Sequence, residues 1–410
     1  GPVYLCGARE VMEADIGPHS LDQKLWEPVE LGGLPTKAAA NIAGALAGAE
    51  RPLLITGYSG RNPKIPGALV ELADTIKGLR VLDMGGSDMS FPGNHPAWLG
   101  LRYGSHEEIT KADVILVLNC DVPWIPILCK PRIDAKIFHI DVDPLKELMP
   151  HFYIQAKTRY KADALTSVEQ ITANPKASKS LAAMDQSSVE AKRREAFEAK
   201  IAGIEKVSEP QSDDRFGTGF LSKVLRRICP GDTIWAHEAV TNTGFVHDNI
   251  RPTKPLSFIN CGGGAALAGS VALHWASSWQ VMLKLVARAR ARDGTHLFSV
   301  PGSVYWISQR YKIPVLTIVL NNKVMMERAS QIKAAGPPQR PCRKGDQRGD
   351  QHFVRACSRL CRHRQGRRRG AIHAMRVEKA AELEVVLKEA VATVQAGTTT
   401  VVDCKVSSDC

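Results

Sequence analysis

Two stretches decide the fold of this chain: residues 112–119, Ala-Asp-Val-Ile-Leu-Val-Leu-Asn, and residues 137–144, Ile-Phe-His-Ile-Asp-Val-Asp-Pro. Each is a short apolar run that ends in polar residues. Near-continuous apolar strands are typical of a parallel sheet that is covered on both faces. Both stretches are therefore predicted to be buried strands of such a sheet.

The same alternation of apolar runs and helix-length segments continues along the chain. Before residue 112, it predicts strands at 52–56 and 80–83 and helices at 36–49 and 65–77. After residue 212, it predicts strands at 232–235, 256–260, 315–320 and 399–403 and helices at 303–310 and 378–395. Strand–helix alternation predicts the α/β class. We expect two doubly wound parallel-sheet domains.

The expected organisation is a short N-terminal piece, two domains and a linker. The predicted bounds are 1–22, which opens on a strand at Val3–Leu5, a central domain at 23–170, a linker and helix at 171–212, and a second domain at 213–410. The charged run Lys192–Glu195 in the linker helix is expected to be a solvated face. Because the sequence has no starting Met, we expect it to begin within a longer protein.

Composition places the chain among globular proteins. Of 410 residues, 44% are hydrophobic and 23% are charged, and no apolar run approaches the ~20 residues of a membrane-spanning helix. The ten cysteines are scattered rather than dense in a short secreted domain. We therefore expect reduced thiols, an intracellular and cytoplasmic protein, and no membrane partner.

The net charge of +12 belongs to one segment. Between Arg328 and Gly370, 13 residues are basic and two are acidic, so the segment carries +11 and the rest of the chain +1. A basic arm for nucleic acid is one interpretation. Another is a zinc site, although the spacing of the available ligands is irregular. Those ligands are Cys342, His352, Cys357, Cys361 and His363.

The chemical signature lies between Asp293 and Asn322. Asp293-Gly294 opens a segment, and Asn321-Asn322 stands at the end of a predicted strand, with 26 residues, 295–320, between the two dipeptides. In an open parallel sheet, ligands lie beyond the carboxyl ends of the strands, where these side chains can converge. Carboxylate and amide oxygens suit Mg²⁺, which commonly completes its shell with phosphate oxygens. The alternative interpretation is that both dipeptides are ordinary turns.

This block resembles a known cofactor-binding motif. Asp293 to Asn322 is similar to the thiamine-diphosphate motif, in which GDG is followed after about two dozen residues by NN. Residues 36–165 resemble the central domain of the same family, through Leu54–Gly57, Ala112–Ile115 and His139–Pro144. The family includes acetolactate synthases and benzoylformate decarboxylases. Gly1–Leu5 resembles the last strand of its pyrimidine-binding domain.

The resemblance implies a site and a reaction. Asp293 and Asn322 would bind Mg²⁺ through their side chains, and Val324 through its carbonyl. Thiamine diphosphate would be contacted by four residues, Gly294, Thr295, Thr241 and Asn242. The substrate would be a small 2-oxo acid, which is decarboxylated or joined to a second molecule. Family enzymes build the site between two subunits, so a homo-oligomer is implied.

The sequence also departs from the family. Arg292 stands where the first glycine of GDG is expected, and no residue can be given the role of the activating glutamate of the pyrimidine domain. We expect impaired or absent turnover. Two off-pattern patches, 265–292 and 328–370, are interpreted as shifted-frame translation, because codons permitted for Arg340–Gly370 also encode a family-like peptide one base later. The transcript sequence tests this interpretation.

Two further functions stay open at this stage. The first is binding of a dinucleotide such as FAD by the central domain, through Gly57–Gly60 and Asp141 or Asp143, although GxGxxG is missing. The second is nucleic-acid binding through residues 328–370. Because that segment is interpreted as shifted-frame translation and the rest of the chain is nearly neutral, we expect no nucleic-acid partner. Which 2-oxo acid is used cannot be deduced from the sequence.

Overall fold

A computed structural model of the chain describes residues 4–85, 88–147, 149, 154–174, 186–239, 242–260, 286–291, 301–321 and 372–407. The chain divides into residues 1–32 and residues 33–410. The first part holds α1 (Arg9–Glu13) and the 3₁₀ helix η1 (Gln23–Leu25), and its described residues are exposed throughout. Tyr4 and Leu5 lie in no strand, so the strand predicted there is wrong for both, because none of the described strands pairs with them.

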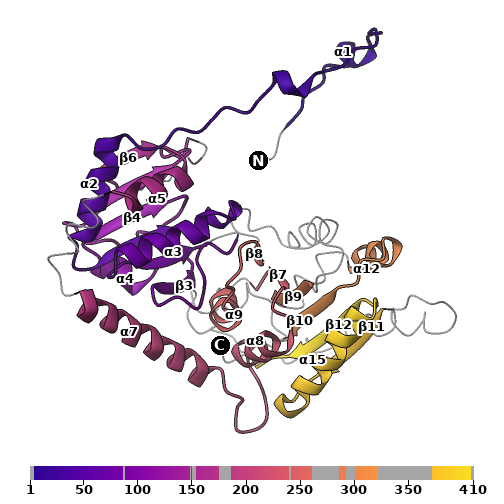
Figure 1. Ribbon diagram of the computed structural model, residues 1–410. Coiled ribbons are helices and arrows are strands. Elements are labelled where there is room, and N and C mark those ends of the chain that lie inside the picture. Colours follow the sequence, from indigo (N-terminus) through magenta and orange to yellow (C-terminus); the bar gives the residue numbers. More distant parts are fainter. Residues whose placement is uncertain are drawn as a thin grey trace, which may run out of the picture. The chain divides into compact units, whose positions relative to one another are not determined.

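A six-stranded sheet forms the central domain (Figure 1). Its strands are β1 (Pro52–Thr56), β2 (Arg80–Met84), β3 (Trp98–Arg102), β4 (Val114–Leu118), β5 (Lys136–Asp141) and β6 (Thr158–Lys161). They are parallel and lie in the order β3-β2-β1-β4-β5-β6. This is the order of doubly wound, dinucleotide-binding sheets. The helices are α2 (Thr36–Ala47), α3 (Ile65–Thr75), α4 (Glu107–Lys111) and α5 (Ala164–Thr172).

Alternate residues of these strands face opposite sides of the sheet. Leu54, Leu116 and Phe138 pack in one cluster with residues of α2, α3 and α5. Leu53 and Ile115 pack in another cluster with Ile109 of α4. Because both faces are buried, the strands carry apolar residues at successive positions, which is the pattern that the sequence shows.

The second sheet lies between residues 234 and 405. Its strands are β7 (Ile234–His237), β8 (Phe258–Asn260), β9 (Val286–Ala291), β10 (Leu316–Asn321), β11 (His373–Val377) and β12 (Thr400–Lys405). They are parallel, in the order β11-β12-β10-β9-β7-β8. The helices are α8 (Thr218–Ile228), α9 (Thr243–Ile250), α12 (Pro301–Arg310) and α15 (Ala380–Gln395).

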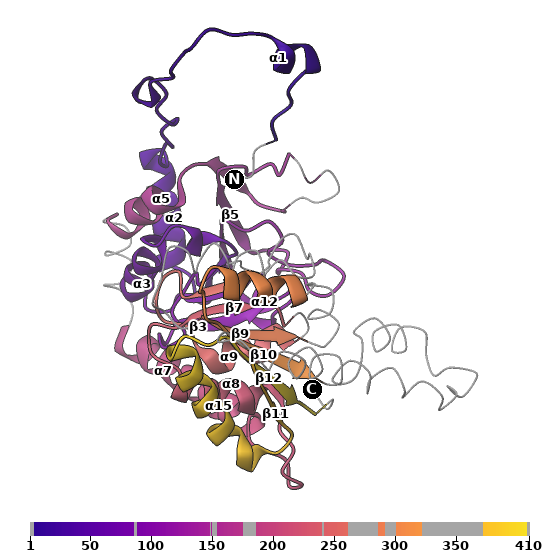
Figure 2. The same ribbon diagram turned by 90° about the vertical axis from the view of Figure 1, so that its right-hand side faces the viewer.

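Helices cover both faces of this sheet too. Val402 of β12 packs in a cluster with Leu225 of α8 and Leu387 of α15. Its neighbour Val401 points the other way and packs with Val304 of α12. Figure 2 shows α12 and α15 on opposite sides of the strands. The predicted class, α/β with two doubly wound parallel sheets, is confirmed.

Four strands were not predicted: β3, β6, β9 and β11. β3 contains Gly100, whose φ of +92° accompanies a register shift against β2. β9 lies inside the patch 265–292 that we considered off-pattern, with the sequence Val-Ala-Arg-Ala-Arg-Ala. Short strands with glycine or alternating polar residues lack the apolar run on which the prediction relied.

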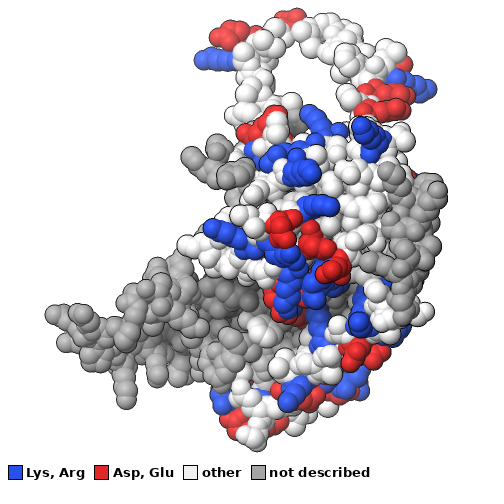
Figure 3. All heavy atoms as spheres, turned by 90° about the vertical axis from the view of Figure 1, so that its left-hand side faces the viewer, with Lys and Arg blue, Asp and Glu red and all other residues white. Residues whose placement is uncertain are grey.

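Helix α7 (Gln186–Val207) follows the central sheet. Arg193, expected to be solvated, is only 6% exposed and donates to the Ala73 carbonyl at 2.8 Å. On the face of the molecule that lies on the left-hand side of Figure 1, basic and acidic side chains of the described residues intermingle (Figure 3). No helix in the described ranges is long and apolar enough to cross a membrane.

Candidate functional site

Three adjacent strands of the second sheet end at the same edge. β10 lies next to β9, and β9 lies next to β7. All three run in parallel, with Leu320 opposite Ala291 and Ile234 opposite Val286. Their carboxyl ends are Asn321, Ala291 and His237. In sheets of this kind, the carboxyl ends of the strands are where ligands bind.

The predicted metal and cofactor residues follow these strand ends in the sequence. Asp293, Gly294 and Thr295 come after β9, Asn322 and Val324 come after β10, and Thr241 and Asn242 come after β7. Of these seven, only Asn242 belongs to the described residues; the other six lie outside them. The strand order therefore brings together the three places from which the predicted site residues start.

Asn242 is the described member of the set. It is buried, it precedes α9, its amide Nδ2 lies 3.3 Å from Thr218 Oγ1, and its backbone N–H donates to the Ala239 carbonyl. A side-chain amide has two N–H donors, and among the described residues Thr218 Oγ1 is an acceptor for this one. Of the seven predicted residues, Asn242 is therefore the one whose side chain the structure places, directly before the first turn of α9.

His237, the last residue of β7, is a structural histidine rather than a base. It is 1% exposed, and its Nδ1 accepts a hydrogen bond from the Ala239 N–H. Burial, followed by the nearby His247, lowers the pKa of His237 to about 3. The imidazole is therefore neutral at physiological pH, and its ring packs edge-on against Phe258.

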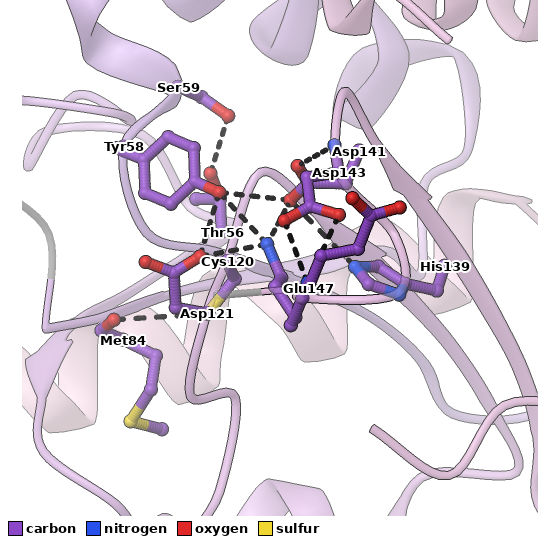
Figure 4. A network of polar contacts seen from close by, with 11 residues as sticks. Thr56, Tyr58, Ser59, Met84, Cys120, Asp121, His139, Asp141, Asp143 and Glu147 are labelled. Carbon is purple, nitrogen blue, oxygen red and sulfur yellow. Dashed lines mark hydrogen bonds and ion pairs between the residues drawn. The ribbon is translucent and has the colours of Figure 1, made fainter. Parts of the chain in front are cut away.

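A second polar site lies at the carboxyl ends of the central strands (Figure 4). Lys146 Nζ donates to Asp141 Oδ2 at 2.7 Å, to Asp121 Oδ1 at 2.8 Å and to the Tyr58 hydroxyl at 3.1 Å. The Tyr58 hydroxyl also lies 2.9 Å from Asp121 Oδ1 and 3.0 Å from Asp141 Oδ2. Tyr58 follows β1, Asp121 follows β4, and Asp141 ends β5.

The protonation states of this cluster follow from burial and pairing. Burial alone raises the pKa of Asp141, but His139 and the hydrogen bonds from Lys146 and the Asp143 amide outweigh it and lower the pKa to about 2. We give Lys146 the larger share, because the His139 ring lies 3.8 Å from the carboxylate. Burial lowers the pKa of Lys146, but its two carboxylate partners raise it above its usual value. Burial, then Asp141 and Asp121, raise the pKa of Tyr58.

The sequence reasoning missed part of this cluster. It named Gly57–Gly60, Asp141 and Asp143; His139, beside Asp141 on β5, is completely buried. It did not name Asp121 or Lys146. Asp121 had a usable signal, because it follows a predicted strand and so had to meet Asp141 at one edge of the sheet. Lys146 had none, because it is a single lysine in a loop.

These features define the class of protein: a two-sheet α/β protein whose predicted site residues follow the carboxyl ends of strands in the second sheet. Within that class, residues 39–170 match the family model of the thiamine pyrophosphate enzyme, central domain. The resemblance to thiamine-diphosphate-dependent enzymes is thereby confirmed.

Solved structures share the fold. The chain is similar to a thiamine diphosphate-dependent 4-hydroxybenzoylformate decarboxylase of Rhodococcus jostii, with 17% identity and a TM-score of 0.67, over 93% of this chain and 66% of that one. It is also similar to benzoylformate decarboxylase of Polynucleobacter necessarius, with 15% identity and a TM-score of 0.68, over 96% and 68% of the two chains. The chain thus spans about two thirds of their length. No curated protein sequence matches it.

Proposed function

We propose that this chain binds thiamine diphosphate and Mg²⁺ at the carboxyl edge of the second sheet and belongs to an enzyme that decarboxylates or ligates small 2-oxo acids. One observation carries the proposal: β7, β9 and β10 are adjacent and end at one edge, and each is followed in the sequence by residues of the predicted site. The match of residues 39–170 to the family supports it.

The donor set fits the cofactor. Asp293 and Asn322 would supply hard oxygen ligands to Mg²⁺, together with the Val324 carbonyl, which is the ligand type this ion prefers. Gly294, Thr295 and Thr241 would face the diphosphate, with Asn242 adding one N–H. The first turn of α9 adds the favourable end of a helix dipole. Bound thiamine diphosphate supplies the carbanion and the electron sink of 2-oxo acid chemistry.

The substrate class stays a proposal. The two solved neighbours are named for benzoylformate and 4-hydroxybenzoylformate, which are aryl 2-oxo acids. Together with pyruvate, these are the first compounds to test. A homo-oligomer and domain bounds of 23–170 and 213–410 are part of the same proposal.

Cofactor binding by the purified chain tests the proposal directly. Calorimetric titration of thiamine diphosphate in the presence of Mg²⁺ is expected to show saturable binding, and Asp293→Ala is expected to abolish it. The matched control is Asp134→Ala, since that exposed carboxylate pairs with Arg132 on the surface and is not a predicted site residue. Equal affinity of the Asp293→Ala variant and the control would contradict the assigned site.

The same protein can be titrated with DNA at two salt concentrations. Binding to DNA that weakens steeply with salt, without any cofactor affinity, would favour the alternative function of nucleic-acid binding through residues 328–370. That segment lies outside the described residues, as do the cysteines and histidines of the alternative zinc site.

FAD is the remaining cofactor that the sequence left open. The strand order of the central sheet favours a dinucleotide at the carboxyl ends of β1 and β4, where the connections that follow the two strands leave in opposite directions. The side chains found at that point, Tyr58, Asp121, Asp141 and Lys146, argue against FAD, for the reasons given below.

A further inference from the structure

The central sheet has the topology of a dinucleotide-binding domain. From β1 the chain proceeds to β2 and β3 on one side, and from β4 to β5 and β6 on the other. The loops after β1 and β4 therefore leave in opposite directions, and in open α/β sheets this switch point forms the crevice for a ligand. Any nucleotide bound by this sheet is expected between Tyr58, after β1, and Asp121, after β4.

The side chain of Lys146 occupies the space between Tyr58 and Asp121 where a nucleotide would be expected. Its ammonium group lies at 2.7–3.1 Å from groups that follow or end β1, β4 and β5, and the residue is 4% exposed. Tyr58, Asp121 and Asp141 point toward one another across these strand ends (Figure 4). The side chain thus lies across the switch point and uses all three of its N–H donors there.

The backbone donors of the first turn after β1 are also used. The N–H groups of Gly57 and Tyr58 both donate to the Asn119 carbonyl at 3.0 Å. In dinucleotide-binding sheets, amides of this turn and its glycines meet the pyrophosphate. Here Gly60 has another purpose, because a Cβ on it would lie 2.4 Å from the Met89 carbonyl oxygen.

The charge of the cluster disfavours a phosphate as well. Two ionised carboxylates, Asp121 and Asp141, surround one ammonium, so the three groups together carry a net charge of −1. A diphosphate brought to this point would meet negative charge at short range and would have to displace three hydrogen bonds from Lys146. Among the described residues, the donors of Lys146 and the amides of Gly57 and Tyr58 already have acceptors, and the three ionic groups of the cluster carry a net negative charge. Both features disfavour an anion at this point.

We infer that the central sheet keeps the topology of a dinucleotide-binding domain but holds no nucleotide, because Lys146 acts as an internal counter-ion that occupies the ligand's place at the switch point. The central domain then supports the second sheet and does not bind FAD or ADP. The inference concerns this sheet alone and does not depend on thiamine diphosphate binding.

Hydrogen–deuterium exchange of the full chain with and without FAD or ADP tests the inference where it applies. We expect no change of exchange in peptides that contain residues 56–64 and 119–122, even if a nucleotide binds elsewhere on the molecule. Protection of these peptides by FAD, or by ADP, would overturn the inference.

The role of Lys146 has its own test. Lys146→Met leaves Asp121 and Asp141 uncompensated, so its thermal midpoint is expected to fall more than that of Lys136→Met, a change at an exposed position of β5. Adding Asp121→Asn to Lys146→Met should recover part of the loss, and this comparison remains usable if the single variant folds poorly. A Lys146→Met protein as stable as the control, or a double variant no more stable than the single one, contradicts the counter-ion role.

Discussion

At the scale of single residues, Gly60, in the turn after β1, and Gly67, in the helix α3 that follows, have different surroundings. Gly60 has the Met89 carbonyl where a Cβ would be, whereas Gly67, in the first turn of α3, has no atom within 4 Å. The first glycine is required by a close backbone approach, and the second only leaves the helix without a side chain.

This contrast gives a matched pair of substitutions. Gly60→Ala is expected to destabilise the protein by about 1–3 kcal/mol, because the added methyl forces the backbone of Met89 to move. Gly67→Ala is expected to stabilise it by about 0.5–1 kcal/mol, through helix propensity. Urea unfolding of the two variants measures both effects, and shifts of the same sign would refute the description of this loop.

Two buried histidines make stability depend on pH. Burial lowers the pKa of His247, with Arg102 and Lys200 adding to the effect, and His247 and His237 both have a pKa of about 3. In the unfolded chain, a histidine titrates near 6.5. Below that pH, each histidine is protonated in the unfolded state but stays neutral in the folded state. The free energy of unfolding therefore decreases as pH falls from about 6.5 toward 3.

The expected slope is roughly 1.4 kcal/mol per pH unit for each histidine. Replacing His247 by Phe keeps a ring beside Trp98 and Phe258 and should remove one histidine's share of the slope between pH 6.5 and pH 4.5. Equal slopes in the wild type and His247→Phe would contradict this assignment.

At the scale of elements, β3 and α9 are joined by one ion pair. Arg102 donates to Asp248 through both terminal nitrogens, at 3.0 Å and 2.7 Å. Gly100 makes room for it, since a Cβ there would lie 2.7 Å from Asp248 Oδ1. Lys200 of α7 lies 3.7 Å from the centre of the Trp98 ring beside it. A strand of the central sheet is thus fixed to a helix of the second sheet and to α7.

Breaking this pair should therefore weaken the contact between the two sheets. Arg102→Met is expected to cost about 2 kcal/mol, because Asp248 loses two charge-assisted hydrogen bonds at a site where it is largely buried. Arg132→Met removes an exposed pair of similar geometry, with Asp134, and should leave the unfolding midpoint unchanged. Chemical unfolding of the two variants decides, and equal midpoints would show that the pair does not hold β3 to α9.

At the scale of the whole molecule, the two parallel sheets have taken different roles in our account. In the central sheet, Lys146 occupies the switch point. In the second sheet, β7, β9 and β10 end at one edge, and the segments that follow them carry the residues of the proposed site. The proposed cofactor should consequently act on stability through the second sheet.

Thiamine diphosphate with Mg²⁺ is expected to raise the free energy of unfolding by about 2.7 kcal/mol at a ligand concentration 100-fold above Kd. The thermal midpoint of unfolding should rise accordingly. Chelation of Mg²⁺ by EDTA should reverse the rise, because the proposed site would hold the cofactor together with Mg²⁺, with Asp293 and Asn322 as ligands of the metal. Differential scanning calorimetry measures both steps. A shift that persists in EDTA would argue against a metal-dependent site.

The sequence by itself determined the α/β class, most strand positions and the resemblance to thiamine-diphosphate enzymes, because apolar periodicity and motif spacing are local properties of the chain. It missed β3, β6, β9 and β11, whose short or alternating sequences acquire strand structure only by pairing with neighbours. Only the tertiary structure decided that Lys146 closes the switch point and that Arg102 joins Asp248. Both contacts unite residues far apart in the sequence, so their energy depends on a packing that no local pattern encodes.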